Sequence, residues 1–139
     1  MAFELAPKFA KVRFAGIWRS DRTRTRETAR LAGFPDVPTD VRLRELHFGD
    51  LEGKTYEEVG EEWREKLRNF ADFQAPNGES TADLYRRAES FLAELVLGRH
   101  LIFTHGGWIR SLMAQCGSDR FPDKAELVKI DWPNRRILS

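Results

Sequence analysis

Residues 101–114 read LIFTHGGWIRSLMA, and this stretch decides the fold. Its first four residues form a largely apolar run, which is typical of a strand buried on both faces. Two glycines follow His105, and the apolar residues after them recur at helical spacing. A buried strand that turns at once into a helix is the unit of a parallel α/β sheet. The stretch therefore predicts an α/β protein, a three-layer α/β/α sandwich with a mostly parallel sheet.

His105 stands where the predicted strand ends and the predicted helix begins. In open α/β sheets, ligands bind beyond the carboxyl ends of the strands. Glycine lets the backbone approach a ligand closely, and a helix N-terminus offers free N–H groups to an anion. An imidazole at this point could hold a phosphoryl group or move a proton. The alternative interpretation is a histidine that only caps the helix.

A second stretch, FAGIWRSDRTRTRETA (residues 14–29), begins with a predicted strand at 14–18 and continues into an arginine-rich turn. Guanidinium groups bind phosphate through paired hydrogen bonds, so one or two of these arginines at the strand end could clamp a phosphate. The others lie at helical spacing and are expected on a solvated helix face. The arginines of this turn are Arg19, Arg22, Arg24 and Arg26.

A third stretch, VRLRELHFGDLEG (residues 41–53), carries Glu45 and His47 in a glycine-containing loop. A carboxyl that points into a phosphate pocket can act as a general acid or base. The alternative interpretation for Glu45 is an ordinary ion pair with Arg42 or Arg44.

Hydrophobic spacing and turn residues predict the remaining elements. Ser20 or Asp21 could cap a helix that runs to about Leu31, and Ser80 with Asp83 resembles a capping box. Further helices are expected at 2–12, 59–73 and 84–95, and further strands at 41–45, 126–131 and 135–138 around Pro133.

Length and composition narrow the class of protein. The 139 residues fit one domain, and 41% apolar with 32% charged residues is a globular composition. No apolar run reaches the ~20 residues of a membrane span, and the single cysteine, Cys116, excludes an internal disulfide. We expect a cytoplasmic enzyme or binding protein without a metal or other cofactor.

The uneven distribution of charge leaves a nucleic-acid binder as an alternative. Residues 13–30 hold six arginines against two carboxylates, whereas residues 45–65 hold eight carboxylates against two cations. The acidic segment and the lack of an aromatic stacking pattern among the arginines argue against nucleic-acid binding. The net charge of +1 argues the same way.

Four segments in this order resemble the histidine phosphatase superfamily, also called phosphoglycerate mutase-like. The resemblance runs from about Leu5 to about Ile130, and in overall pattern the bacterial α-ribazole phosphatases look most similar. It implies hydrolysis of small phosphomonoesters, or a mutase-like phosphotransfer, through a phosphohistidine and without a cofactor. The four segments are SDRTRTRETA (20–29), LRELHFGDLEG (43–53), PNGESTADLYRR (76–87) and FTHGGWIR (103–110).

The same resemblance implies roles for individual residues. Arg24 matches the phosphate-clamping arginine, with Arg22 as the alternative if the register differs. Glu45 matches the proton donor, and His105 matches the second catalytic histidine, with the N–H of Gly106 on the phosphate. We therefore expect an oxyanion near His105, Gly106 and Arg24, and Glu45 in the same cleft.

The sequence departs from the family pattern in one respect. Family members begin with a strand that ends in Arg-His-Gly, whose histidine is the nucleophile, and no Arg-His-Gly occurs in these 139 residues. His47 and His100 do not match its place. The resemblance thus implies a single domain over 1–139 that lacks the first strand and some C-terminal residues.

Two consequences of this departure are expected. The chain is either a phosphatase domain whose activity is impaired in this form or a non-catalytic module that binds a phosphorylated ligand. Strands 14–18 and 101–104 are expected to flank the gap left by the missing strand. Either chains associate through this edge, for example as a homodimer, or the gap is filled by water or by the chain's own rearranged N-terminal segment.

Overall fold

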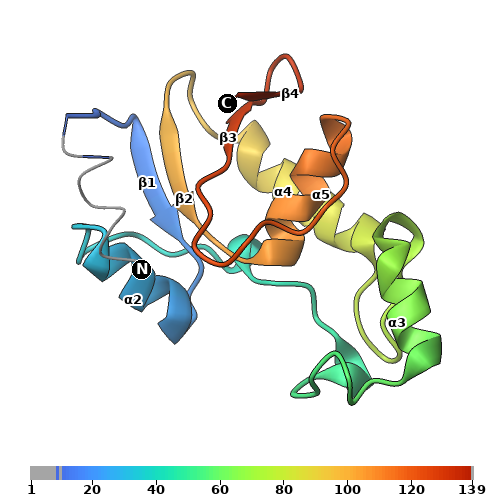
Figure 1. Cartoon of the computed structure of the whole chain (residues 1–139). Helices are drawn as coiled ribbons and strands as arrows, with labels where there is room; N and C mark the ends of the chain where they lie inside the picture. The colour runs from blue at the N-terminus through green and yellow to red at the C-terminus, as the bar shows by residue number, and fades with distance from the viewer. Residues whose placement is uncertain (1–8, 10, 139) are drawn as a thin grey trace.

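The computed structural model describes residue 9 and residues 11–138. The helix predicted at 2–12 falls almost entirely outside the described residues. Strand β1 (Gly16–Arg19) pairs in parallel with β2 (His100–Phe103), with Gly16 opposite His100 and Arg19 opposite Phe103. The two strands lie side by side in Figure 1 although most of the chain separates them in sequence. The strands predicted at 14–18 and 101–104 are confirmed with small shifts of their ends.

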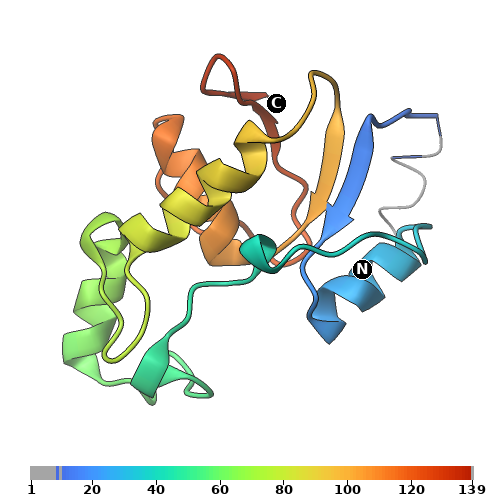
Figure 2. The same ribbon diagram turned by 180° about the vertical axis from the view of Figure 1, so that it is seen from behind.

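Helices cover both faces of this small sheet (Figures 1 and 2). Helix α2 (Thr23–Leu31) lies on one face, whereas α4 (Thr81–Ala93) and α5 (Gly106–Gln115) lie together on the other. Successive strand residues point to opposite faces. Leu101 and Phe103 therefore join the apolar cluster beneath α2, and Ile102 joins the larger cluster beneath α4 and α5.

The sheet is smaller than the sequence predicted. Among the described residues its parallel part has two strands, extended only by an isolated bridge between Arg19 and Thr39. A separate antiparallel pair forms from β3 (Lys129–Asp131) and β4 (Arg136–Leu138), as expected for the two segments around Pro133. The fold is α/β, with two small sheets and four α-helices in the described part of the chain.

The strand predicted at 41–45 is wrong. Residues Val41–Leu43 form the 3₁₀ turn η2, because the Asp40 carboxylate accepts the N–H of Arg42 at 2.8 Å and closes a turn. This turn orients the loop that follows, which carries Glu45. A second 3₁₀ turn, η3 (Gly49–Leu51), lies within the same loop region.

The helix predicted at 59–73 is shorter in the structure. Helix α3 (Glu61–Arg68) ends at Asn69, which leaves the helical region with φ −95° and ψ 64°, and the 3₁₀ turn η4 (Phe70–Asp72) follows. The aromatic spacing that suggested a longer helix instead places Phe70 in a stacked pair with Phe73, with ring centroids 6.1 Å apart. Both rings are buried.

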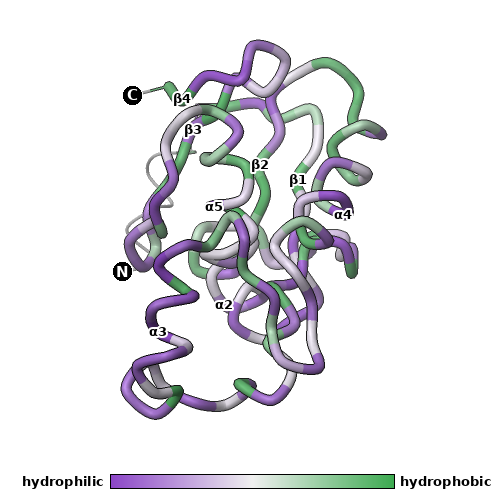
Figure 3. The backbone as a smooth tube through the Cα atoms, turned by 90° about the vertical axis from the view of Figure 1, so that its right-hand side faces the viewer, coloured by the Kyte–Doolittle hydropathy of each residue, from purple (hydrophilic) through white to green (hydrophobic). Residues whose placement is uncertain are grey.

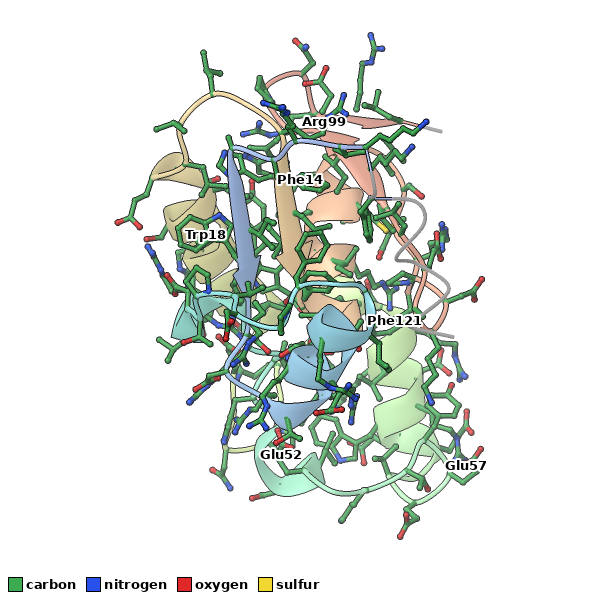
Figure 4. All side chains as sticks on the ribbon, turned by 90° about the vertical axis from the view of Figure 1, so that its left-hand side faces the viewer. Phe14, Trp18, Glu52, Glu57, Arg99 and Phe121 are labelled. Atoms are coloured by element: carbon green, nitrogen blue, oxygen red, sulfur yellow. The ribbon has the colours of Figure 1, made fainter. Side chains whose placement is uncertain are left out.

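Helix α4 confirms the predicted cap, since Ser80 Oγ accepts the N–H of Asp83 at 3.0 Å. From α4, Phe91 meets Trp18 of β1 in an edge-to-face pair with centroids 5.6 Å apart, and Figure 4 shows Trp18 on the α4 side of β1. This contact joins the helical layer to the sheet.

Helix α3 is a polar element of the fold, and none of its residues is buried. Figure 3 shows this helix largely in the hydrophilic colour, while β2 is mostly hydrophobic. Within the described residues, no helix combines the length and the apolarity needed to cross a bilayer.

Candidate active site

A broad cleft of about 1700 Å³ opens where β2 ends and α5 begins. The start of α5 contributes His105 and Gly106, the start of α2 contributes Arg22 and Arg24, and the loop after η2 contributes Glu45. Residues 121–127 form a further part of its wall. The structure thus brings all five sequence-predicted site residues to one cleft, at the strand end where ligands of α/β sheets bind.

The register of the sheet positions His105. The N–H of Ser20, the residue after β1, donates to the carbonyl of Phe103, so the residues that follow both strands lie next to each other. His105 begins α5 with extended backbone angles, but its side chain makes no capping hydrogen bond. Its Nε2 instead lies 2.8 Å from the fully buried Ser20 Oγ. His105 is therefore the N-cap residue of α5, but its side chain bonds to Ser20 and does not cap the helix.

The surroundings of His105 favour its neutral form. Burial, followed by the positive charges of Arg24, Arg22 and Arg87, lowers the pKa of His105 to about 4. The imidazole is therefore uncharged at neutral pH.

Glu45 is held by backbone donors rather than by an ion pair. Its Oε2 accepts the N–H of Gly107 at 2.9 Å, and its Oε1 accepts the N–H of Leu46 at 2.8 Å. Burial raises the pKa of Glu45 above its ordinary value, although these donors oppose the effect. The carboxyl group consequently contacts the first turn of the helix that His105 begins.

The ion pairs considered for Glu45 do not form in the structure. Arg42 pairs with Asp40 and Glu94, and Arg44 pairs with Asp21. The Arg44 guanidinium in turn lowers the pKa of Asp21 to about 2. Because these arginines pair elsewhere, the Glu45 carboxyl bonds to the α5 N-terminus instead.

The arginines of the turn after β1 divide into two groups. Arg22 and Arg24 line the cleft, and neither has an ion-pair partner among the residues that the structure describes. Arg26 lies off the cleft, and Arg19 donates to the carbonyl of the neighbouring Ser20. Both guanidinium groups lower the pKa of His105, and the effect of Arg24 is larger than that of Arg22.

Arg87 is a site-building residue that sequence reasoning missed. Its guanidinium donates to three carbonyls at the start of the Glu45 loop, those of Arg42 (2.8 Å), Arg44 (2.6 Å) and Glu45 (2.8 Å). Its remaining donors bind the Glu79 carboxylate at 2.8 and 3.0 Å. The signal was available, because Arg87 occupies a position within the apolar stripe of α4, where a charge needs a buried partner.

Glu79 and Ser20 were also missed as site residues. Glu79 accepts the N–H of His47 at 3.0 Å, and it thereby holds the same loop from the other side. Ser20 was interpreted as a helix cap, but the N-cap of α2 is Arg22 and has no side-chain cap bond. No local pattern indicates the contact between Ser20 and His105, because it depends on the pairing of β1 with β2.

In the described part of the chain, no three His, Cys, Asp or Glu side chains are grouped so that they could hold a metal ion.

Comparison with known proteins gives the family. The family model described as histidine phosphatase superfamily (branch 1) matches residues 1–135. The chain therefore belongs to the histidine phosphatase superfamily, and its fold is the α/β, phosphoglycerate mutase-like fold of its structural neighbours.

Individual relatives include both mutases and phosphatases. The chain is 33% identical over 137 residues to 2,3-bisphosphoglycerate-dependent phosphoglycerate mutase 2 of Gloeobacter violaceus, covering 87% of this chain and 62% of that protein. It is 37% identical over 116 residues to the probable phosphoglycerate mutase GpmB of Escherichia fergusonii, covering 76% and 54%. The chain thus spans less than two thirds of the length of these curated relatives.

Solved structures agree with this assignment. The crystal structure of phosphoglycerate mutase from Thermus thermophilus matches with a TM-score of 0.86 and 36% identity, covering 99% of this chain and 77% of that one. The mycobacterial glucosyl-3-phosphoglycerate phosphatase matches with a TM-score of 0.70 and 28% identity, covering 83% and 63%.

Proposed function

We propose that this chain supplies the phosphate clamp, the second histidine and the proton donor of a phosphatase that hydrolyses small phosphomonoesters through a phosphohistidine. The observation that carries the proposal is the meeting of Glu45, His105 and the α5 N-terminus in a cleft that also holds two arginines without ion-pair partners among the described residues. Free N–H groups, guanidinium groups and an imidazole are the donors that a phosphate requires.

Each residue has a proposed step in this chemistry. A histidine nucleophile attacks phosphorus, a nitrogen–phosphorus bond forms and the phosphorus–oxygen bond to the leaving group breaks. Glu45 gives its proton to the leaving oxygen, and its raised pKa favours the protonated form that this step needs. Arg24, His105 and the N–H of Gly106 stabilise the equatorial oxygens. Water then hydrolyses the phosphohistidine, with Glu45 accepting the proton.

The names of relatives and the overall sequence pattern support a substrate class for this proposal. Relatives bear names of mutases and phosphatases of phosphoglycerates, and α-ribazole phosphate is a further candidate from the overall sequence pattern. Phosphoglycerates and α-ribazole phosphate are all small phosphomonoesters.

A binding test addresses the proposal directly. We expect inorganic phosphate, titrated into the 139-residue chain and followed by calorimetry, to bind at one site. Arg24→Ala should weaken that binding about tenfold or more, since a hydrogen bond to a charged group contributes ~1.5–3 kcal/mol. Arg26→Ala is the matched control, because Arg26 belongs to the same helix and lies off the cleft. Equal affinities of parent and Arg24→Ala would refute the clamp.

A second candidate function is a non-catalytic module that binds a phosphorylated ligand. The arginines and the helix N-terminus in the cleft support it, because these groups can bind an anion whether or not a nucleophile is present. Hydrolysis of p-nitrophenyl phosphate distinguishes the two functions. Phosphate binding without turnover by this chain supports the module, whereas turnover would support the phosphatase.

A further inference from the structure

Two buried hydroxyl groups connect His105 to the backbone of the turn after β1. His105 Nε2 lies 2.8 Å from Ser20 Oγ, and Ser20 Oγ lies 2.8 Å from Thr25 Oγ1. Thr25 Oγ1 lies 2.9 Å from two carbonyl oxygens, those of Ser20 and Arg22. Both hydroxyl-bearing residues are buried, with exposures of 0% for Ser20 and 3% for Thr25.

The direction of each hydrogen bond in this chain of hydroxyls follows from counting hydrogens. A carbonyl oxygen can only accept, so the single hydroxyl hydrogen of Thr25 points toward the carbonyls of Ser20 and Arg22. Thr25 Oγ1 then has no hydrogen for Ser20, and the Ser20 hydroxyl must donate to it. Ser20 Oγ is left as an acceptor for His105 Nε2.

We infer that Ser20 and Thr25 are positioning residues that hold neutral His105 as the tautomer protonated on Nε2, which leaves Nδ1 unprotonated and available to a ligand. Nδ1 has no hydrogen-bond partner among the described residues, and His105 lines the cleft. The inference deepens the proposed function and rests on it for the identity of the ligand, although the tautomer itself can be measured without one.

The arrangement has a consequence for proton uptake. The charges acting on the ring are those of Arg22 and Arg24 from the start of α2, Arg87 from α4 and Asp21 from the turn after β1. A phosphate dianion in the cleft would offset the three cations and favour a second proton on the ring. Because Nε2 already carries a hydrogen, that proton, taken from water, can bind only at Nδ1, where it can be donated to a phosphate oxygen. His105 Nε2 donates to Ser20 Oγ both when the ring is neutral and when it is protonated.

Thr25→Val provides a sharp test, since valine keeps the shape of threonine and removes only the hydroxyl. Without an acceptor at position 25, the Ser20 hydroxyl is free to donate to His105 Nε2, which requires the proton to move to Nδ1. Long-range ¹H–¹⁵N spectra of the ligand-free chain at neutral pH distinguish the two tautomers. We expect the Nε2-protonated form in the parent and a shift toward the Nδ1-protonated form in Thr25→Val, with Thr25→Ser restoring the parent spectrum.

Thr28→Val is the matched control, because Thr28 lies on the same helix and donates to the Arg24 carbonyl at 3.0 Å on the exposed side. It should leave the His105 spectrum unchanged. A parent chain protonated on Nδ1, or a Thr25→Val spectrum identical to that of the parent, overturns the inference. The parent spectrum alone decides the tautomer if Thr25→Val does not fold.

A titration with inorganic phosphate separates this inference from the proposed function. Protonation of Nδ1 on adding phosphate supports both. An unchanged ring signal, together with the expected tautomers in the phosphate-free spectra, leaves the hydroxyl chain established and contradicts the phosphate site.

Discussion

The carboxylate of Glu45 occupies the space beside Gly107 that a side chain at position 107 would need. It accepts the Gly107 N–H at 2.9 Å, and a Cβ atom added to this glycine would overlap Glu45 Oε1. The second glycine of the His-Gly-Gly sequence therefore makes room for the proposed proton donor.

This relationship predicts different effects for the two adjacent glycines. Gly107→Ala should displace the Glu45 carboxyl and lower the free energy of unfolding by about 1–3 kcal/mol, the usual cost of leaving a buried polar group unsatisfied. Gly106→Ala is the control for stability, since its Cβ would meet only Phe121 at an ordinary 3.5 Å. Urea denaturation at neutral pH measures both. A Gly107→Ala variant as stable as Gly106→Ala would show that Glu45 does not depend on this space.

Arg87 should be irreplaceable by lysine. Lysine cannot reach three carbonyls and the Glu79 carboxylate at once, because it lacks the planar fork of donors. We expect Arg87→Lys to lower the free energy of unfolding by about 2–4 kcal/mol. The neighbouring Arg86 pairs with Asp83 on the surface, so Arg86→Lys should change stability by no more than about 0.5 kcal/mol. Similar urea midpoints for the two variants would contradict the role given to Arg87.

His105 should make stability depend on pH. Its pKa is about 4 in the folded chain against an ordinary value of 6.5, so the unfolded chain takes up the proton first as the pH falls. The contribution of His105 to stability is therefore complete above about pH 6.5 and is lost progressively between pH 6.5 and 4.

Urea denaturation at several pH values, from about 7.5 down to about 4.5, shows whether the free energy of unfolding falls as the pH falls. The parent should lose more stability over this window than His105→Gln. Parallel curves for the parent and His105→Gln would mean that the folded environment does not disfavour the charged ring.

The edge of β2 that faces away from β1 pairs with no strand in the described part of the chain and should exchange its amide hydrogens quickly. Strand residues direct their N–H groups alternately to the two sides, and in β2 the described pairing is with β1 alone. The carbonyl of Phe103 faces β1, so the N–H of Ile102 faces the opposite edge. We expect the amide of Ile102 to exchange faster than those of Leu101 and Phe103. Equal protection of the three amides at low concentration would show that another segment covers this edge.

An edge without a partner strand among the described residues also predicts self-association. An unpaired apolar strand recruits another strand, so the average mass in sedimentation should rise with protein concentration. Protection of the Ile102 amide from hydrogen exchange should increase together with the average mass. A concentration-independent monomer mass would speak against association through β2.

The local patterns of the sequence determined the elements around His105. An apolar run, a histidine, two glycines and a helical stripe specify strand β2, its end and helix α5 within about fifteen residues, because each depends on neighbours in the chain. The same holds for the cap of α4 by Ser80. Local pattern was insufficient at 41–45, where one hydrogen bond from Arg42 N–H to Asp40 replaced a strand by a turn.

The tertiary structure alone decided how the site is held. Ser20 looked like a helix cap, but the register of β1 against β2 places its hydroxyl beside His105, 85 residues away. Arg87 stands beside the exposed Arg86 in the sequence, but the packing of α4 against the 42–45 loop gives its guanidinium three carbonyl partners. Such contacts bring together side chains from distant segments, and no short-range pattern encodes a geometry that exists only after the sheet and helices have packed.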